Sequence, residues 1–129
     1  MPFEIRNEGD CLFIVLSGVL TAPDLHRLVT EAQALEEAMS AVPNRITDMT
    51  SVVKFEFDSG AIAEIAERRR ARTFPNSFKS GLIAGRPVAL GLARMFQTLN
   101  DHPQIEIKIF GTVQEAKDWF AGKPAAARR

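Results

Sequence analysis

The chain has 129 residues, 46% of them hydrophobic and 25% charged, which suits one globular domain with its own core and the composition of a soluble protein. Sixteen basic and sixteen acidic residues cancel, and this balance argues against a general nucleic-acid binder. The longest apolar run, residues 11–16, is far too short to cross a bilayer, and a single cysteine cannot form an internal disulfide. We therefore expect a cytoplasmic protein that does not span a membrane.

The N-terminal residues predict an antiparallel hairpin. Residues 3–6 alternate apolar and charged side chains, as a half-buried strand does. Turn-forming residues follow at 7–10, and residues 11–17 are then almost continuously apolar. This pattern predicts that the second strand of the hairpin is covered on both faces.

The next segment predicts a helix, a short strand and a stretch with two interpretations. Thr21 begins the helix, Pro23 stands in its first turn, and apolar residues at helical spacing continue until Pro43 ends it. Residues 45–50 are a strand candidate. Residues 52–57 either prolong that strand or form an apolar loop.

The rest of the sequence alternates helices with strands, and capping residues and prolines mark the boundaries. The expected elements are a helix that begins at 58–60 and ends at 73–76, a strand at 78–84, a helix that ends at 100–103, a strand at 105–109 and a capped helix from 112 to 120.

The resulting order, β-β-α-β-α-β-α-β-α, predicts one α/β domain over residues 1–121, followed by a frayed tail at residues 122–129. Strands that alternate with helices imply right-handed crossovers. We therefore expect a mostly parallel mixed sheet of about five strands with an antiparallel N-terminal hairpin and about four helices.

Three stretches carry the motifs of a known family. They are the apolar strand and helix start at 12–21, the run from Asp48 to the helix start at Gly60, and the helix-strand-helix at 91–116. Together they resemble the STAS domain, the fold of bacterial anti-sigma-factor antagonists of the SpoIIAA type. The likeness is strongest to a divergent STAS-like and SEC14-like group of uncharacterised bacterial proteins.

The resemblance implies a non-enzymatic regulatory module, similar to anti-sigma-factor antagonists, that binds another protein of the kinase or anti-sigma type. Ser59 matches the phosphoacceptor of the family when the aspartate before it is aligned, whereas alignment on Gly60 leaves no hydroxyl at that place. A phosphate at a helix N-terminus is favoured by unpaired N–H groups, but Asp58 or Ser59 at this position can equally be a plain helix cap. The expected partner-binding surface comprises Asp58, Ser59, Gly60, Ile62, Glu64 and Arg68.

An arginine-rich run follows on the same helix at residues 68–72. At 100° per residue, Arg68, Arg69 and Arg72 fall within one arc, and Glu64 precedes Arg68 by four residues, the favourable order for a helical ion pair. We expect a solvated, partly paired face rather than a phosphate-binding patch.

The SEC14-like side of the resemblance implies an alternative function, a carrier of a small molecule or lipid. Its apolar pocket is expected between the second helix and the sheet, lined by Phe55, Phe57, Ile62 and Phe78. The other interpretation of these side chains is that they seal the core.

The sequence favours neither catalysis nor a cofactor. His26 and His102 lie at no metal-ligand spacing and are expected at the surface, and Cys11 is expected to be an inert core thiol. No nucleophile, base and orienting group can be assembled, so we expect no enzyme, no metal and no cofactor. The strand at 105–109 is a candidate edge of the sheet, and a homodimer through this edge is one of the possible assemblies.

Overall fold

Five strands form one mixed sheet in which the spatial order of the strands equals their order in the chain. The computed structural model describes residues 2–8 and 10–123, so the predicted tail lies mostly outside the described residues. The strands are β1 (Phe3–Asn7), β2 (Cys11–Thr21), β3 (Asn44–Glu56), β4 (Phe78–Ile83) and β5 (Ile105–Phe110). β1 pairs with β2 antiparallel, and the other three pairings are parallel. The predicted mixed α/β sheet is confirmed.

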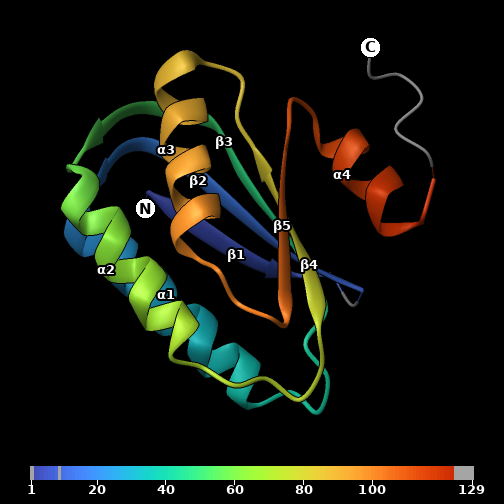
Figure 1. The fold of residues 1–129 in the computed structure, drawn as a ribbon. Helices are drawn as coiled ribbons and strands as arrows, with labels where there is room; N and C mark the ends of the chain where they lie inside the picture. Colours follow the sequence, from blue (N-terminus) through green and yellow to red (C-terminus); the bar gives the residue numbers. More distant parts are fainter. Residues whose placement is uncertain (1, 9, 124–129) are drawn as a thin grey trace.

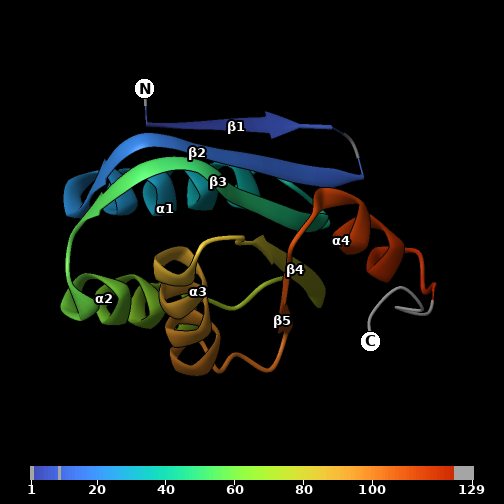
Figure 2. The same ribbon diagram turned by 90° about the horizontal axis from the view of Figure 1, so that it is seen from above.

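The helices divide unequally between the two faces of the sheet. They are α1 (Ala22–Glu37), α2 (Ser59–Arg70), α3 (Pro87–Leu99) and α4 (Val113–Phe120). Because the strands follow one another across the sheet, right-handed crossovers place α1, α2 and α3 on the same face. α4 comes after the last strand and packs on the opposite face (Figures 1 and 2).

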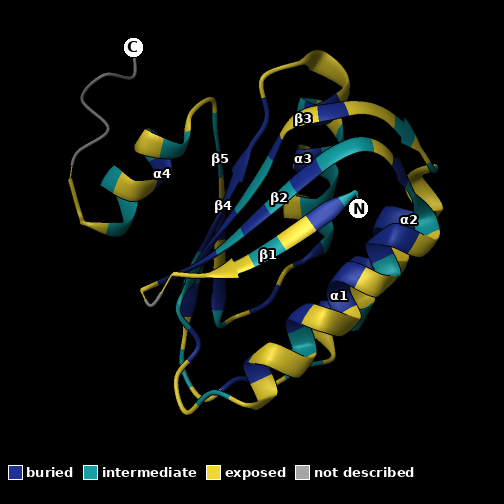
Figure 3. Cartoon of the chain, turned by 180° about the vertical axis from the view of Figure 1, so that it is seen from behind, coloured by how far each residue is buried: buried dark blue, intermediate teal, exposed yellow. Residues whose placement is uncertain are grey.

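Each face of the sheet has its own hydrophobic core. The larger core fills the space between the sheet and the first three helices. The smaller one, on the α4 side, is formed by Cys11, Ile46, Ile83 and Ala116. Figure 3 shows buried residues along the central strands, and exposed positions on the outer side of α1.

β3 is longer than the strand predicted at residues 45–50, and this resolves the two interpretations of residues 52–57. A single strand of 13 residues continues to Glu56. Its pairing with β4 stops at Asp48, whereas its pairing with β2 continues to the end. The second half of β3 therefore extends beyond β4 and carries Phe55 toward the N-terminus of α2.

The start of α1 is built as predicted. The Thr21 hydroxyl accepts a hydrogen bond from the Asp24 N–H, and the Asp24 carboxylate accepts one from the Thr21 N–H at 2.9 Å. This bond, the Thr21 hydroxyl and Arg27 lower the pKa of Asp24, although burial opposes them. The helix ends at Glu37, earlier than the predicted end at Pro43, because residues 38–43 are the connection that leads into β3.

His102 is buried, so the prediction of a surface histidine is wrong for this residue. Its Nδ1 accepts a hydrogen bond from the Gln104 N–H at 2.9 Å, and its Nε2 donates one to the Arg72 carbonyl at 2.6 Å. The ring also packs against Phe74, with 5.3 Å between the ring centroids. The turn after α3 thus folds onto the segment after α2, a contact between residues 30 positions apart that local sequence patterns do not report.

Candidate functional site

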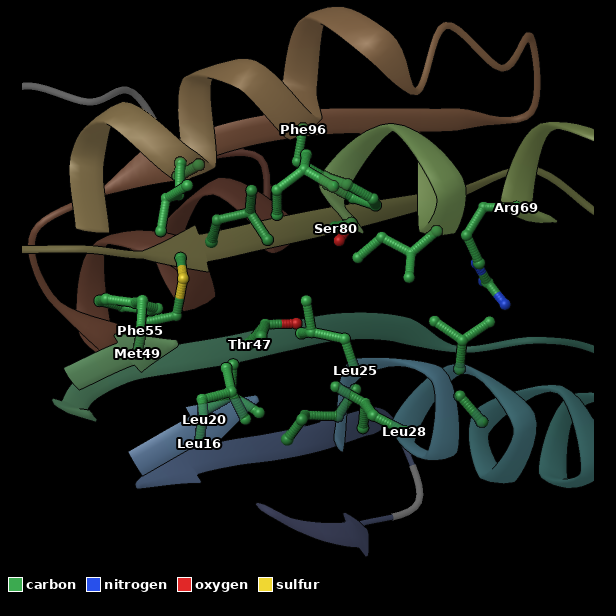
Figure 4. A pocket seen from close by; sticks show the side chains of 18 of the residues that line it. Leu16, Leu20, Leu25, Leu28, Thr47, Met49, Phe55, Arg69, Ser80 and Phe96 are labelled. Carbon is green, nitrogen blue, oxygen red and sulfur yellow. The ribbon is translucent and has the colours of Figure 1, made fainter. Parts of the chain in front are cut away.

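An apolar cavity of about 110 Å³ lies between the sheet and the three helices that cover it (Figure 4). Strands β2, β3 and β4 line it on one side, and helices α1, α2 and α3 line it on the other. Most of its wall is aliphatic or aromatic, with contributions from Leu16, Leu20, Leu28, Met49, Leu82 and Phe96.

Small side chains at central positions leave this space unfilled. Thr47 on β3 and Ser80 on β4 face the helices, where the alternation of these strands would otherwise place large apolar side chains. Ala32 on α1 and Ala93 on α3 face them from the other side. Protein interiors are normally packed as densely as organic crystals, so a void of this volume is a specific feature of the core.

Three of the four residues predicted for an apolar pocket line this cavity. Phe55, Phe57 and Ile62 are part of its wall. Phe78 is not part of it; its ring packs edge to face against Phe74, with 5.2 Å between centroids, and lies beneath the Arg45 guanidinium. The cavity is therefore displaced along the sheet, away from the start of β4.

A buried ion cluster stands at the edge of the cavity. Glu36 at the end of α1 is 2% exposed and accepts hydrogen bonds from the guanidiniums of Arg45 on β3 and Arg69 on α2. Arg69 binds both oxygens of this carboxylate, at 2.9 Å from Nη1 to Oε1 and 2.8 Å from Nη2 to Oε2. Both arginines line the cavity.

The burial of Arg69 contradicts the expected solvated arginine face. Its side chain is 4% exposed, although its neighbours Arg68 and Arg70 are more accessible. Sequence reasoning missed a usable signal, because Arg69 follows Ile62 by seven residues and Ile65 by four and so continues the buried stripe of α2. A charged side chain in such a stripe needs a buried partner, and Glu36 provides it.

The cluster carries an excess positive charge. Burial, and then the proximity of Arg69, lowers the pKa of Arg45. Burial, and then Arg72, lowers the pKa of Arg69 to about 10. Guanidiniums nevertheless stay protonated in proteins at neutral pH. Two buried cations therefore share one carboxylate, and the Nε of Arg45 has no hydrogen-bond partner among the described residues.

The start of α2 shows which of the two predicted residues is the cap. Oδ1 of Asp58 accepts hydrogen bonds from the Gly60 N–H at 3.0 Å and the Ala61 N–H at 3.4 Å, so Asp58 is the N-cap. Ser59 is the first helical residue and is exposed. Within the part of the chain that is described, its hydroxyl makes no hydrogen bond, so it is not needed to hold the helix.

Other residues predicted for a partner surface are engaged inside the domain. Arg68 donates hydrogen bonds to the His26 carbonyl at 3.1 Å and to the Thr30 hydroxyl at 2.9 Å. Glu64 lies 3.2 Å from Nε2 of His26, and the expected ion pair between Glu64 and Arg68 is not among the ion pairs of the described residues. These side chains hold α1 against α2. Ile62 is buried and faces the cavity.

Cys11 lies in the smaller core, at the start of β2. Burial raises the pKa of its thiol to about 11, and the charges of Asp10 and Glu8 act in the same direction. A thiol that stays neutral at physiological pH is a poor nucleophile.

Among residues 2–8 and 10–123, no group of three or more His, Cys, Asp or Glu side chains is placed to hold a metal ion. No helix in the same part of the chain is long and apolar enough to cross a membrane.

A solved structure that is similar to this chain identifies the fold. It is the crystal structure of an uncharacterized protein from Shewanella loihica PV-4, described as a DUF3478-family protein with a SpoIIAA-like fold. The two chains are 16% identical with a TM-score of 0.59, and the likeness covers 92% of this chain and 91% of the other. The chain has a SpoIIAA-like fold. The fold implied by the resemblance to STAS domains is thereby confirmed.

The SpoIIAA-like fold by itself assigns no function, since one fold carries unrelated activities. No protein-family model matches the sequence, and neither does any curated protein.

Proposed function

We propose that this SpoIIAA-like domain is a binding module that holds a small apolar molecule in the cavity between the sheet and helices α1, α2 and α3. The single observation that carries the proposal is the cavity of about 110 Å³ with its largely aliphatic and aromatic wall. An engineered apolar cavity of about 150 Å³ stays dry and binds benzene, so a void of this size suits a ligand of similar dimensions. The role is binding, and we assign no reaction to it.

Toluene is a suitable first probe, because it is apolar and close in size to the cavity. We expect the methyl resonances of Leu16, Leu20 and Leu82 to shift in ¹³C NMR spectra during a toluene titration, while methyls of the smaller core, such as those of Ile83, stay in place. The melting temperature should rise with toluene concentration, since a ligand that binds only the folded state stabilises it.

A pair of identical substitutions separates cavity binding from unspecific binding. Ala93→Leu places a larger side chain into the cavity from α3 and should abolish the methyl shifts. Ala63→Leu introduces the same side chain at an exposed position of α2 and should leave them unchanged. If the cavity methyls of the wild type do not respond to saturating toluene, the proposed function is wrong.

We propose a second candidate function, regulatory binding of a kinase or an anti-sigma-type protein at the N-terminus of α2. The observation in its favour is that Asp58 alone provides the cap, which leaves the exposed Ser59 hydroxyl accessible. A phosphate there would add about two negative charges at the positive end of the helix dipole and beside the Asp58 carboxylate. Such a change can end a complex with an acidic partner surface.

Mass spectrometry of the protein purified from its own host tests this candidate. We expect a covalent phosphate that maps to Ser59 and disappears in Ser59→Ala, while Ser77→Ala, a change at another exposed serine, retains it. An unmodified Ser59 under conditions in which the protein is expressed and folded argues against a phosphate switch.

A further inference from the structure

The cavity has a polar side that an entirely apolar ligand would leave unused. Arg45 and Thr47 occupy alternate positions of β3 on the face that the helices cover, and Ser80 is the register partner of Arg45 on β4. These three adjacent positions of the central strands are where an α/β sheet normally carries its largest apolar side chains. Their polarity therefore needs an explanation.

The hydroxyls of Thr47 and Ser80 lie on this polar side of the cavity. Figure 4 shows the oxygens of Thr47 and Ser80 at the cavity, between Arg69 on one side and Phe55 and Met49 on the other. Within the described residues, neither hydroxyl makes a side-chain hydrogen bond. Each can donate to an acceptor that enters the cavity.

The buried charges beside the hydroxyls do not balance. Arg45 and Arg69 contribute two positive charges, and among the described residues only the Glu36 carboxylate pairs with them. Arg69 binds both oxygens of that carboxylate and Arg45 binds one of them, while among the described residues the Nε of Arg45 is buried without a partner. A second negative charge at this place would neutralise the excess and accept the unused hydrogen bonds, because charge-assisted bonds of this kind are stronger than neutral ones.

On the basis of the proposed function, we infer that the ligand of the cavity is a small amphipathic monoanion. Its acidic group, a carboxylate or a group of the same charge and size, lies against Arg45, Thr47 and Ser80. Its apolar body lies among the aliphatic and aromatic side chains toward Phe55 and Met49, and the whole ligand has roughly six to eight non-hydrogen atoms. Glu36 holds the Arg45 guanidinium in place and is itself held by Arg69, so both are positioning residues.

Hexanoate and hexan-1-ol test the inference, because they share a six-carbon body and differ in charge at pH 7. Both are titrated into the wild-type protein by calorimetry and by methyl NMR at the same ionic strength. We expect both to shift the methyls of Leu16, Leu20 and Leu82, and hexanoate to bind about tenfold more tightly.

Substitutions test whether the difference in affinity between hexanoate and hexan-1-ol arises at the polar side of the cavity. Arg45→Met removes one buried charge and leaves the bidentate pair of Glu36 with Arg69 intact, so it should abolish the preference for hexanoate while hexan-1-ol binds within about twofold of the wild type. Arg70→Met removes a positive charge from an exposed position of α2 and should keep the preference. If Arg45→Met does not fold, the double variant Thr47→Val, Ser80→Ala serves instead, with a reduced preference expected.

The outcomes distinguish this inference from the proposed function. If hexan-1-ol binds in the cavity and hexanoate binds no more tightly, the anionic ligand is wrong and the apolar binding module stands. If hexanoate binds more tightly but shifts only methyls outside the cavity, or if Arg45→Met retains the preference, the inference is also overturned. If neither ligand nor toluene reaches the cavity methyls, both the inference and the proposed function fail.

Discussion

Replacing Glu36 with glutamine is expected to lower the free energy of unfolding by about 3–5 kcal/mol. Glu36 is the shared partner of two buried guanidiniums, from Arg45 and Arg69. Glutamine has nearly the same volume but no charge, so both cations would remain buried without a counter-ion. The loss is measured by urea denaturation, followed by circular dichroism and by the fluorescence of Trp119.

Glu37→Gln is a closely matched control for this prediction. The neighbouring glutamate also pairs with an arginine of the α2 region, Arg72, at 2.8 Å, but the Glu37 side chain is 64% exposed. Exposed ion pairs contribute about 0–1 kcal/mol, so Glu37→Gln should have little effect on unfolding. Equal effects of the two substitutions would contradict the assignment of Glu36 as the counter-ion of a buried cluster.

Replacing Ile46 with alanine is expected to lower the free energy of unfolding by about 2–5 kcal/mol. Ile46 is fully buried in the smaller core, beside Gly81 in the neighbouring strand. The contact between α4 and the sheet leaves little room for the void to collapse, because a Cβ on Gly81 would come within 3.0 Å of the Ala116 Cβ. A cavity that cannot collapse places the loss toward the upper end of this range.

Val53→Ala provides the comparison on the same strand. Val53 is 73% exposed, so removal of its methyl groups should change the free energy of unfolding by less than about 0.5 kcal/mol. Both variants are measured by the same urea denaturation, with circular dichroism for the whole domain and Trp119 fluorescence for α4. An Ile46→Ala variant as stable as Val53→Ala would show that α4 does not form a tightly packed core with the sheet.

The two faces of the sheet differ in how closely their side chains are packed. The α4 side is packed closely around small residues, whereas the side covered by three helices holds a cavity and a charged cluster. Buried ion clusters are often no more stabilising than apolar side chains of similar volume. A bound anion would account for the position of Arg45 beside a void.

Much of the architecture was predictable from the sequence because its signals are local. The alternation of Ile105, Ile107 and Ile109 with charged residues predicts β5, and the capping residues Thr21 and Thr112 predict the starts of α1 and α4. The order of these elements, together with the handedness of crossovers, then leads to the mixed parallel sheet. The same local rule predicts a cap at Asp58 or Ser59, and the structure shows that it is Asp58.

The candidate site was predictable only in part, because it depends on contacts between distant segments. Periodicity shows which residues share a face of a helix, but not what lies opposite that face. In the sequence, Arg69 therefore resembles its solvated neighbours. Only the structure shows that it pairs with Glu36, which lies 33 residues earlier in the chain. The cavity likewise exists only because α1, α2 and α3 converge over Thr47 and Ser80. The sequence by itself determined the helices and strands and their order. Tertiary packing decided the position of the cavity and of the buried ion cluster beside it, because both depend on which side chains from distant segments fill the same volume.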